Sequence, residues 1–153
     1  NEQTFDALSV QNNSLQDTEI FYAKVNNVNR IFGEDSAMGD NDNDTDILNI
    51  KFSGLDVGAI TAYAYLIDNE DVARFSTDTV GIRFAGNSGK DELKFNYTVE
   101  YAKQEDSNNN AVNYKADYLL FEGGVTVSGI NVKLGHEVLG SDDGAAAKTT
   151  PAE

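Results

Sequence analysis

Six basic residues recur at positions that alternate with apolar side chains along the sequence. They are Lys24, Lys51, Arg83, Lys94, Lys115 and Lys133. Cations that come from adjacent strands and face one confined volume concentrate a positive potential, which attracts anions. Arg30 and Arg74 fall in longer polar segments, where they would meet an anionic solute first. These residues predict a basic surface for anionic small molecules or a polysaccharide.

The same alternation assigns three acidic residues to this surface: Glu100, Asp117 and Glu137. Six cations against three anions leave a local excess of three, which favours attraction of anions. The alternative is that the cations pair with these carboxylates and simply fill an interior. The sequence leaves both interpretations open.

An acidic segment, residues 40–46, carries carboxylates at alternate positions: Asp40, Asp42, Asp44 and Asp46. Hard oxygen ligands suit Ca²⁺, but this segment lacks the glycine and the final glutamate of an EF-hand loop. The pattern therefore predicts either a weak Ca²⁺ site or a solvated acidic surface. No other cofactor is expected.

Composition and motifs exclude several classes of function. The chain has 153 residues, no cysteine, one histidine and a net charge of −15, and its pI is near 4.2. An acidic chain of this kind lacks the basic surface of most nucleic-acid-binding proteins. Nucleophile motifs, phosphate-binding loops and dinucleotide fingerprints are absent. We therefore expect neither an enzyme nor a nucleic-acid partner.

The elements that position these residues are β-strands, because apolar side chains recur with a period of two. The pattern predicts strands over residues 4–11, 18–26, 46–53, 59–67, 77–85, 92–103, 114–127 and 130–139. The connections alternate between short turns, such as 128–129, and long polar segments, at 27–45, 68–76 and 104–113. In an antiparallel meander this order places every short turn at one end. Outer-membrane barrels share this arrangement.

The predicted fold is therefore all-β, an antiparallel up-and-down transmembrane β-barrel formed by residues 1–140. Residues 141–153 form a polar tail or loop. The apolar face would meet lipid and begins with Phe21, Ala23 and Val25, while the basic residues would face the lumen. A soluble β-barrel or sandwich remains the alternative. In that case the apolar face would form the core and the basic face would meet solvent.

Several runs of residues resemble the alginate-export family of proteobacterial outer-membrane porins. They are 17–23 (DTEIFYA), 27–33 (NVNRIFG), 53–55 (SGL), 61–66 (TAYAYL), 97–104 (YTVEYAKQ), 117–118 (DY) and 135–140 (GHEVLG). The resemblance implies a large barrel in the bacterial outer membrane with a positively lined lumen. Family chains are longer, and residues 148–153 lack the closing aromatic residue usual in such barrels. We therefore expect this chain to be a fragment or partial chain that supplies about eight strands of a larger barrel.

Three functional hypotheses follow. The first is a porin-like channel that passes anionic solutes or acidic polysaccharide through the outer membrane. The second is a small eight-stranded barrel for anchoring or adhesion that does not conduct, since the interior of such a barrel is filled by side chains. The third is a soluble, secreted β protein that binds Ca²⁺ through residues 40–46. The oligomeric state is not predicted.

Overall fold

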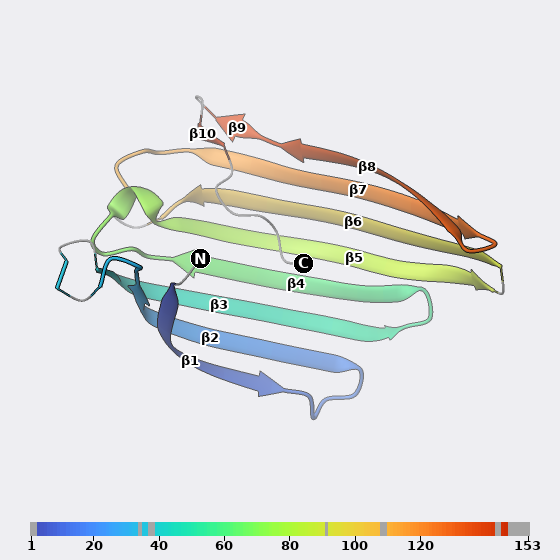
Figure 1. Ribbon diagram of the computed structural model, residues 1–153, viewed down its shortest axis with the longest axis horizontal. Coiled ribbons are helices and arrows are strands. Elements are labelled where there is room, and N and C mark those ends of the chain that lie inside the picture. The colour runs from blue at the N-terminus through green and yellow to red at the C-terminus, as the bar shows by residue number, and fades with distance from the viewer. Residues whose placement is uncertain are drawn as a thin grey trace.

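The computed structural model describes residues 3–33, 35–36, 39–90, 92–107, 110–142 and 145–146. Its main feature is one antiparallel sheet in which each strand pairs with its neighbours in sequence (Figure 1). The eight strands are β1 (Thr4–Asn12), β2 (Thr18–Asn29), β3 (Asp40–Leu55), β4 (Gly58–Ile67), β5 (Thr77–Lys90), β6 (Leu93–Asp106), β7 (Lys115–Val127) and β8 (Ile130–Leu139). The predicted all-β, up-and-down arrangement of eight strands is confirmed.

Little other regular structure accompanies the sheet. A 3₁₀ turn, η1 (Ala73–Phe75), precedes β5, and β9 (Ser141–Asp142) pairs with β10 (Ala145–Ala146). Within the described ranges, no helix has the length and hydropathy needed to cross a membrane.

The connections sort by length to opposite ends of the sheet, as the sequence predicts (Figure 1). One of the shortest joins β7 to β8 through Ser128 and Gly129, which have φ angles of 47° and 86°. Two successive residues with positive φ form the tight turn whose twist matches that of the flanking strands. The end that carries the short connections is called the turn end below, and the opposite end is called the loop end.

Several strands run further than predicted. β2 continues to Asn29 and β3 begins at Asp40, so the predicted loop over residues 27–45 is wrong at both ends. β5 likewise continues to Lys90, beyond the strand end predicted at residue 85, and pairs with β6 throughout its length. Antiparallel neighbours satisfy each other's backbone groups, so pairing continues through Asn- and Gly-rich residues that an isolated strand would not favour.

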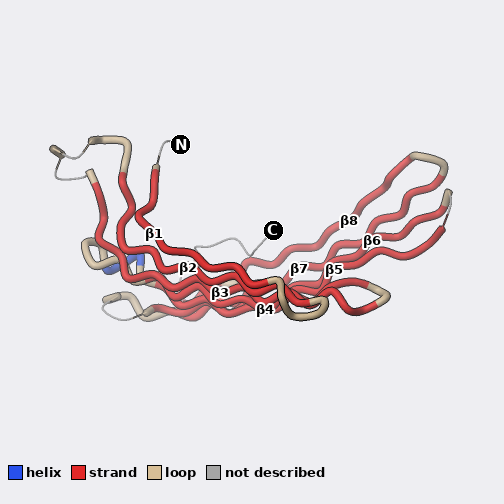
Figure 2. Tube along the Cα trace, turned by 90° about the horizontal axis from the view of Figure 1, so that it is seen from below, coloured by secondary structure: helices blue, strands red, loops and turns tan. Residues whose placement is uncertain are grey.

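The sheet is open and curved into a trough (Figure 2). Strands β1 and β8 both rise on the same side of β4, and they do not pair with each other. The β1–β2 and β2–β3 ladders both shift register beside Asn26, which marks a bulge shared by two ladders. Bulges bend and twist the strand that carries them. The curvature has the form of part of a barrel wall, and closure into a larger barrel stays a prediction.

The described parts of the long connections pack together at the loop end. Ser76 and Tyr114 are 0% and 2% exposed. The Asn110 side-chain amide donates to the Ser76 carbonyl at 2.9 Å, and the Asn69 backbone N–H donates to the Ser76 hydroxyl at 3.0 Å. Burial also raises the pKa of the Tyr114 hydroxyl. These segments therefore form a small polar core of their own beyond the ends of the strands.

Candidate functional site

The register of the sheet decides which side chains share a face, because directly paired residues on antiparallel strands point to the same side. One row of paired residues crosses seven strands. It comprises Glu19, Lys51, Thr61, Arg83, Glu100, Leu120 and Glu137. The face that carries this row is called the polar face. The opposite face carries Ile50, Ile82 and Val99 and is called the apolar face.

The polar face lies on the concave side of the trough, where side chains bury one another. Tyr63, Ala102 and Tyr118 form its buried cluster and are 4%, 3% and 6% exposed. Tyr65 stacks on Tyr63, with ring centroids 5.1 Å apart. Gly81 sits directly beneath the Tyr63 ring and leaves no room there for a larger side chain. Aromatic rings from β4 and β7 therefore pack across β5 and β6.

A buried carboxylate organises the centre of the polar face. Glu100 is 1% exposed and uses both of its oxygens. The Tyr63 hydroxyl donates to Oε1 at 2.7 Å, and the Arg83 guanidinium donates to Oε2 at 3.3 Å. A buried charge needs such partners because desolvation otherwise disfavours it strongly. Glu100 therefore holds Arg83 in place from the β6 side.

Hydrogen bonds continue across the polar face on either side of this centre. The Tyr118 hydroxyl donates to Glu137 at 2.9 Å, and Lys133 forms an ion pair with Glu122 at 2.7 Å. Toward the loop end, the Gln104 amide donates to the Thr79 hydroxyl at 2.9 Å. This face is therefore hydrophilic, and many of its polar side chains form hydrogen bonds or ion pairs with one another.

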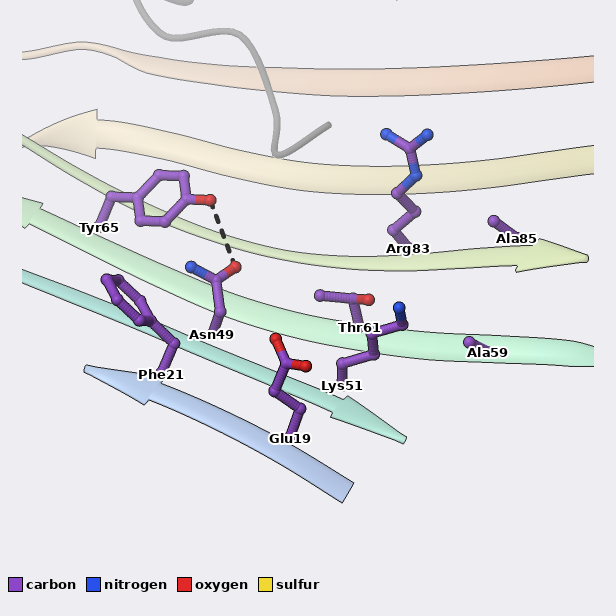
Figure 3. Close-up of a pocket in the computed structure, with 9 residues that line it drawn as sticks. All are labelled: Glu19, Phe21, Asn49, Lys51, Ala59, Thr61, Tyr65, Arg83 and Ala85. Atoms are coloured by element: carbon purple, nitrogen blue, oxygen red, sulfur yellow. Dashed lines mark hydrogen bonds between the residues drawn. The ribbon is translucent and has the colours of Figure 1, made fainter. Parts of the chain in front are cut away.

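A hollow of about 610 Å³ opens on the polar face over β4 (Figure 3). Its floor is made of short side chains, Ala59, Thr61 and Ala85, and longer side chains surround it. The surrounding residues are Glu19, Phe21, Asn49, Lys51, Tyr65 and Arg83. The hollow exists because β4 and β5 place small residues side by side, Ala59 being paired with Ala85.

The apolar face is the convex side, and it lies open to its surroundings. Large apolar side chains on it are exposed by 38% at Ile50, 52% at Ile82, 46% at Phe121 and 78% at Leu134. On β6 this face carries an apolar side chain at each alternate position from Leu93 to Tyr101. Nine residues match the length of a transmembrane strand.

Charged residues border the apolar face toward the loop end. This charged belt consists of Lys24, Asp46, Asp78, Lys103, Glu105, Lys115 and Asp117. Two tyrosines lie at its boundary and point their hydroxyls into it. Tyr22 donates to Asp46 at 2.5 Å, and Tyr101 donates to Asp117 at 2.7 Å. Tyrosine is suited to this position because one end is apolar and the other is polar.

The register corrects several face assignments made from the sequence. Lys24 and Lys115 lie in the charged belt of the apolar face, and so does Asp117. The residues expected to face lipid on β2, Phe21, Ala23 and Val25, lie on the polar face instead. The two faces of β2 are similarly apolar, so its alternation alone does not orient it.

The predicted excess of cations on the polar face is therefore wrong for the described strands. Where the ladders run without a bulge, this face carries four cations, Lys51, Arg83, Lys94 and Lys133. It also carries five acids, Glu19, Glu100, Asp106, Glu122 and Glu137. The described strands therefore carry no uniform row of basic residues on this face. Any preference for anions must come from where individual charged residues lie.

The two predicted loop arginines lie in the long connections. The Arg30 guanidinium stacks on the Phe32 ring at 5.1 Å from its centroid, and Arg74 stacks on Phe75 at 5.0 Å. Cation–π contacts of this kind hold a guanidinium beside an aromatic ring without neutralising its charge. Both cations are positioned at the loop end of the sheet.

The acidic segment is extended strand rather than a loop, because β3 begins at Asp40. Alternate residues of a strand are about 6.6 Å apart, so Asp40, Asp42, Asp44 and Asp46 do not converge on one point. Lys24 forms ion pairs with Asp44 and Asp46. Within the described residues, no group of three or more metal-ligating side chains could hold an ion. The geometry gives the predicted Ca²⁺ site no support.

Sequence reasoning missed Thr61, Tyr63 and Tyr65, because the segment over residues 59–67 is apolar on both faces. The tyrosines could have oriented this segment, because Tyr63 and Tyr65 place their hydroxyls on one face of the strand while Ala62 and Ala64 lie on the other.

Comparison with family models, curated proteins and solved structures finds no match for this chain. The resemblance to the alginate-export family therefore stays a prediction.

Proposed function

We propose that this chain forms part of the wall of an outer-membrane β-barrel pore. Its apolar face meets lipid, and its polar face lines a water-filled path for hydrophilic solutes, anionic ones among them. The observation that carries the proposal is the sorting of side chains by the register. Exposed apolar side chains cover the convex face, and hydrogen-bonded polar side chains cover the concave face.

A water-soluble sheet would normally hide its apolar face against another layer. Here the polar face is the concave, partly buried one, and the apolar face is convex and bordered by charges and tyrosines. That order suits lipid outside and water inside. It supports the membrane proposal over a soluble β protein.

The second candidate, a non-conducting eight-stranded barrel, needs β1 to pair with β8 and the interior to be filled. In the described sheet these strands stay apart, and a hollow of about 610 Å³ lies among the inward side chains. Both features support a segment of a wider barrel.

Single-cysteine and single-tryptophan variants test the proposal cleanly, because the chain contains neither residue. Along β5, Ile82 and Phe84 are on the apolar face, and Arg83 and Ala85 are on the polar face. In protein reconstituted in lipid vesicles, we expect brominated lipids to quench tryptophan at 82 and 84. A water-soluble maleimide should label cysteine at 83 and 85.

The adjacent positions serve as matched controls for each other. Quenching and labelling that do not alternate along β5 would refute the two-face assignment. If the closed barrel that contains this chain shows the alternation but no ion conductance, the non-conducting barrel is favoured. Recovery of the protein in soluble form, with position 82 shielded from brominated lipid, would favour the soluble alternative.

A further inference from the structure

The charged belt of the apolar face is organised differently on different strands. Between β2 and β3 its charges satisfy one another, because Lys24 forms an ion pair with Asp46 at 3.1 Å. Between β5 and β6 they do not. Asp78 and Glu105 are directly paired across these two strands, and Lys103 makes no ion pair with another described residue. This part of the belt therefore has charges left over for a partner.

Asp78 and Glu105 place two like charges side by side. Directly paired residues on antiparallel strands have Cβ atoms about 5 Å apart, and like charges in this position are destabilising. Lys115 approaches Glu105 from β7 at 3.4 Å, but their side chains are 81% and 54% exposed, and an exposed ion pair contributes little. Asp78 forms no hydrogen bond or ion pair with another described residue. The two carboxylates therefore offer a position for a further cation.

Lys103 lies on the same face, one position closer to the apolar side chains of β6. Its paired residue on β7 is Asp117, which accepts a hydrogen bond from the Tyr101 hydroxyl at 2.7 Å. On the β5 side Lys103 is paired with Val80, which is 53% exposed. The exposed ammonium of Lys103 is therefore available to a negative group at the edge of the apolar surface.

The order of these side chains from the turn end to the loop end matches that of an amphiphile. Ile82 and Val80 on β5 come first and are exposed and apolar. Lys103 lies beside Val80, and the paired carboxylates of Asp78 and Glu105 follow. In a phospholipid with an amino headgroup, the acyl chains, the phosphate and the ammonium occur in this same order. Apolar, cationic and acidic side chains can therefore meet these three parts in turn.

We propose that Lys103, Asp78 and Glu105 form a binding site for a lipid headgroup that carries both a phosphate and a primary ammonium group. The Lys103 ammonium donates to the phosphate, and the two carboxylates accept hydrogen bonds from the lipid ammonium. The three side chains sum to −1, which disfavours a headgroup that carries only negative charge. The site rests on the proposed function in one respect, namely that the apolar face meets lipid.

The test uses Val80→Trp as the reporter, because Val80 is paired with Lys103 and the chain has no tryptophan of its own. The protein is reconstituted in vesicles of phosphatidylethanolamine and phosphatidylcholine in equal amounts, with bromine on the acyl chains of one lipid at a time. Quenching should show about threefold higher affinity for phosphatidylethanolamine, the size of one exposed ion pair. Both lipids have the phosphate, but only phosphatidylethanolamine has N–H donors for the carboxylates. The double variant D78N/E105Q should reduce the ratio to about one.

The phosphate contact is tested against brominated diacylglycerol, which has the same acyl chains and no phosphate. K103Q should lower the affinity for phosphatidylethanolamine relative to diacylglycerol by about threefold, and K103R should retain it. Lys90 provides the matched control, because it is an exposed lysine at the turn end of the same face. K90Q should change neither ratio. A reporter at Val132, which is paired with Val125 on β7, should show no preference between the two phospholipids.

Equal quenching by the two phospholipids at position 80 would overturn the headgroup site. So would a ratio that D78N/E105Q leaves unchanged, or an equal effect of K103Q and K90Q. Each of these results leaves the barrel-wall proposal intact, because lipid still reaches position 80. Absence of quenching there by every brominated lipid would reject the apolar face as a lipid surface, and both proposals with it. The two proposals therefore fail in distinguishable ways.

Discussion

Replacing Ile82 by arginine tests whether the cost of a charge on the apolar face depends on its depth in a bilayer. Ile82 is 52% exposed and lies between Ala62 and Tyr101 in its row. In water, a half-exposed position of this kind tolerates arginine at a cost within about 0.5 kcal/mol. At the middle of a bilayer the same change costs about 2–4 kcal/mol.

Leu66 is the matched control for depth. It is 42% exposed on the same face, and its row partners are Asp46 and Asp78 of the charged belt. Leu66 lies four residues along β4 from Ala62, the residue paired with Ile82. Four residues of a strand span about 13 Å. In a strand tilted by about 45°, this corresponds to about 9 Å of depth. Leu66→Arg should therefore cost only about 0–1 kcal/mol.

The assay is equilibrium unfolding of the protein from lipid vesicles in guanidinium chloride, followed by far-ultraviolet circular dichroism. We expect Ile82→Arg to lower the free energy of unfolding by about 2 kcal/mol more than Leu66→Arg. If the two variants lower the free energy of unfolding by amounts within about 0.5 kcal/mol of each other, the reasoning is refuted. On a surface in water, the cost of arginine does not depend on its position along the strand.

Three further predictions concern stability. Gly81→Ala should cost about 1–3 kcal/mol because its new methyl group meets the buried Tyr63 ring, whereas Gly123→Ala, with open space around it, should be near neutral; chemical denaturation compares the two. Gly129→Ala should cost about 1 kcal/mol in the same assay, since φ there is 86°. Burial raises the pKa of Tyr114 above its ordinary value of 10.0. The tyrosine in the unfolded chain therefore ionises first, so the contribution of Tyr114 to the free energy of unfolding is complete below pH 10.0 and is lost as the pH rises through the folded-state pKa. Unfolding measured against pH should show this decline in the parent protein and a smaller decline in Tyr114→Phe, in which the other tyrosines still ionise.

The sequence predicts the strands well because alternation is a local property of each segment. Strong alternation on β5 and β6 also places Arg83, Lys94 and Glu100 on the correct face. The assignment fails on β2, where Ile20 and Tyr22 are about as apolar as Phe21 and Ala23. Only the partner strand resolves such a case, and register is not a local property.

The hollow was beyond prediction for the same reason. Ala59 and Ala85 are distant in sequence, and nothing in either strand indicates that the two small residues are paired. The pairing of Arg83 with Glu100 likewise depends on the β5–β6 register. Residue types therefore indicate which chemistry is available, while the register decides which groups act together.

The strictly sequential order of the strands has a consequence for how such a protein changes over generations. Each strand pairs only with its neighbours along the chain, so the β-hairpin is a self-contained unit of the wall. Gain or loss of one hairpin changes the circumference by two strands and reroutes no connection. It also keeps every tight turn on one side of the wall. A sheet of this design can widen or narrow by duplication and deletion while the chemistry of the remaining strands is inherited intact.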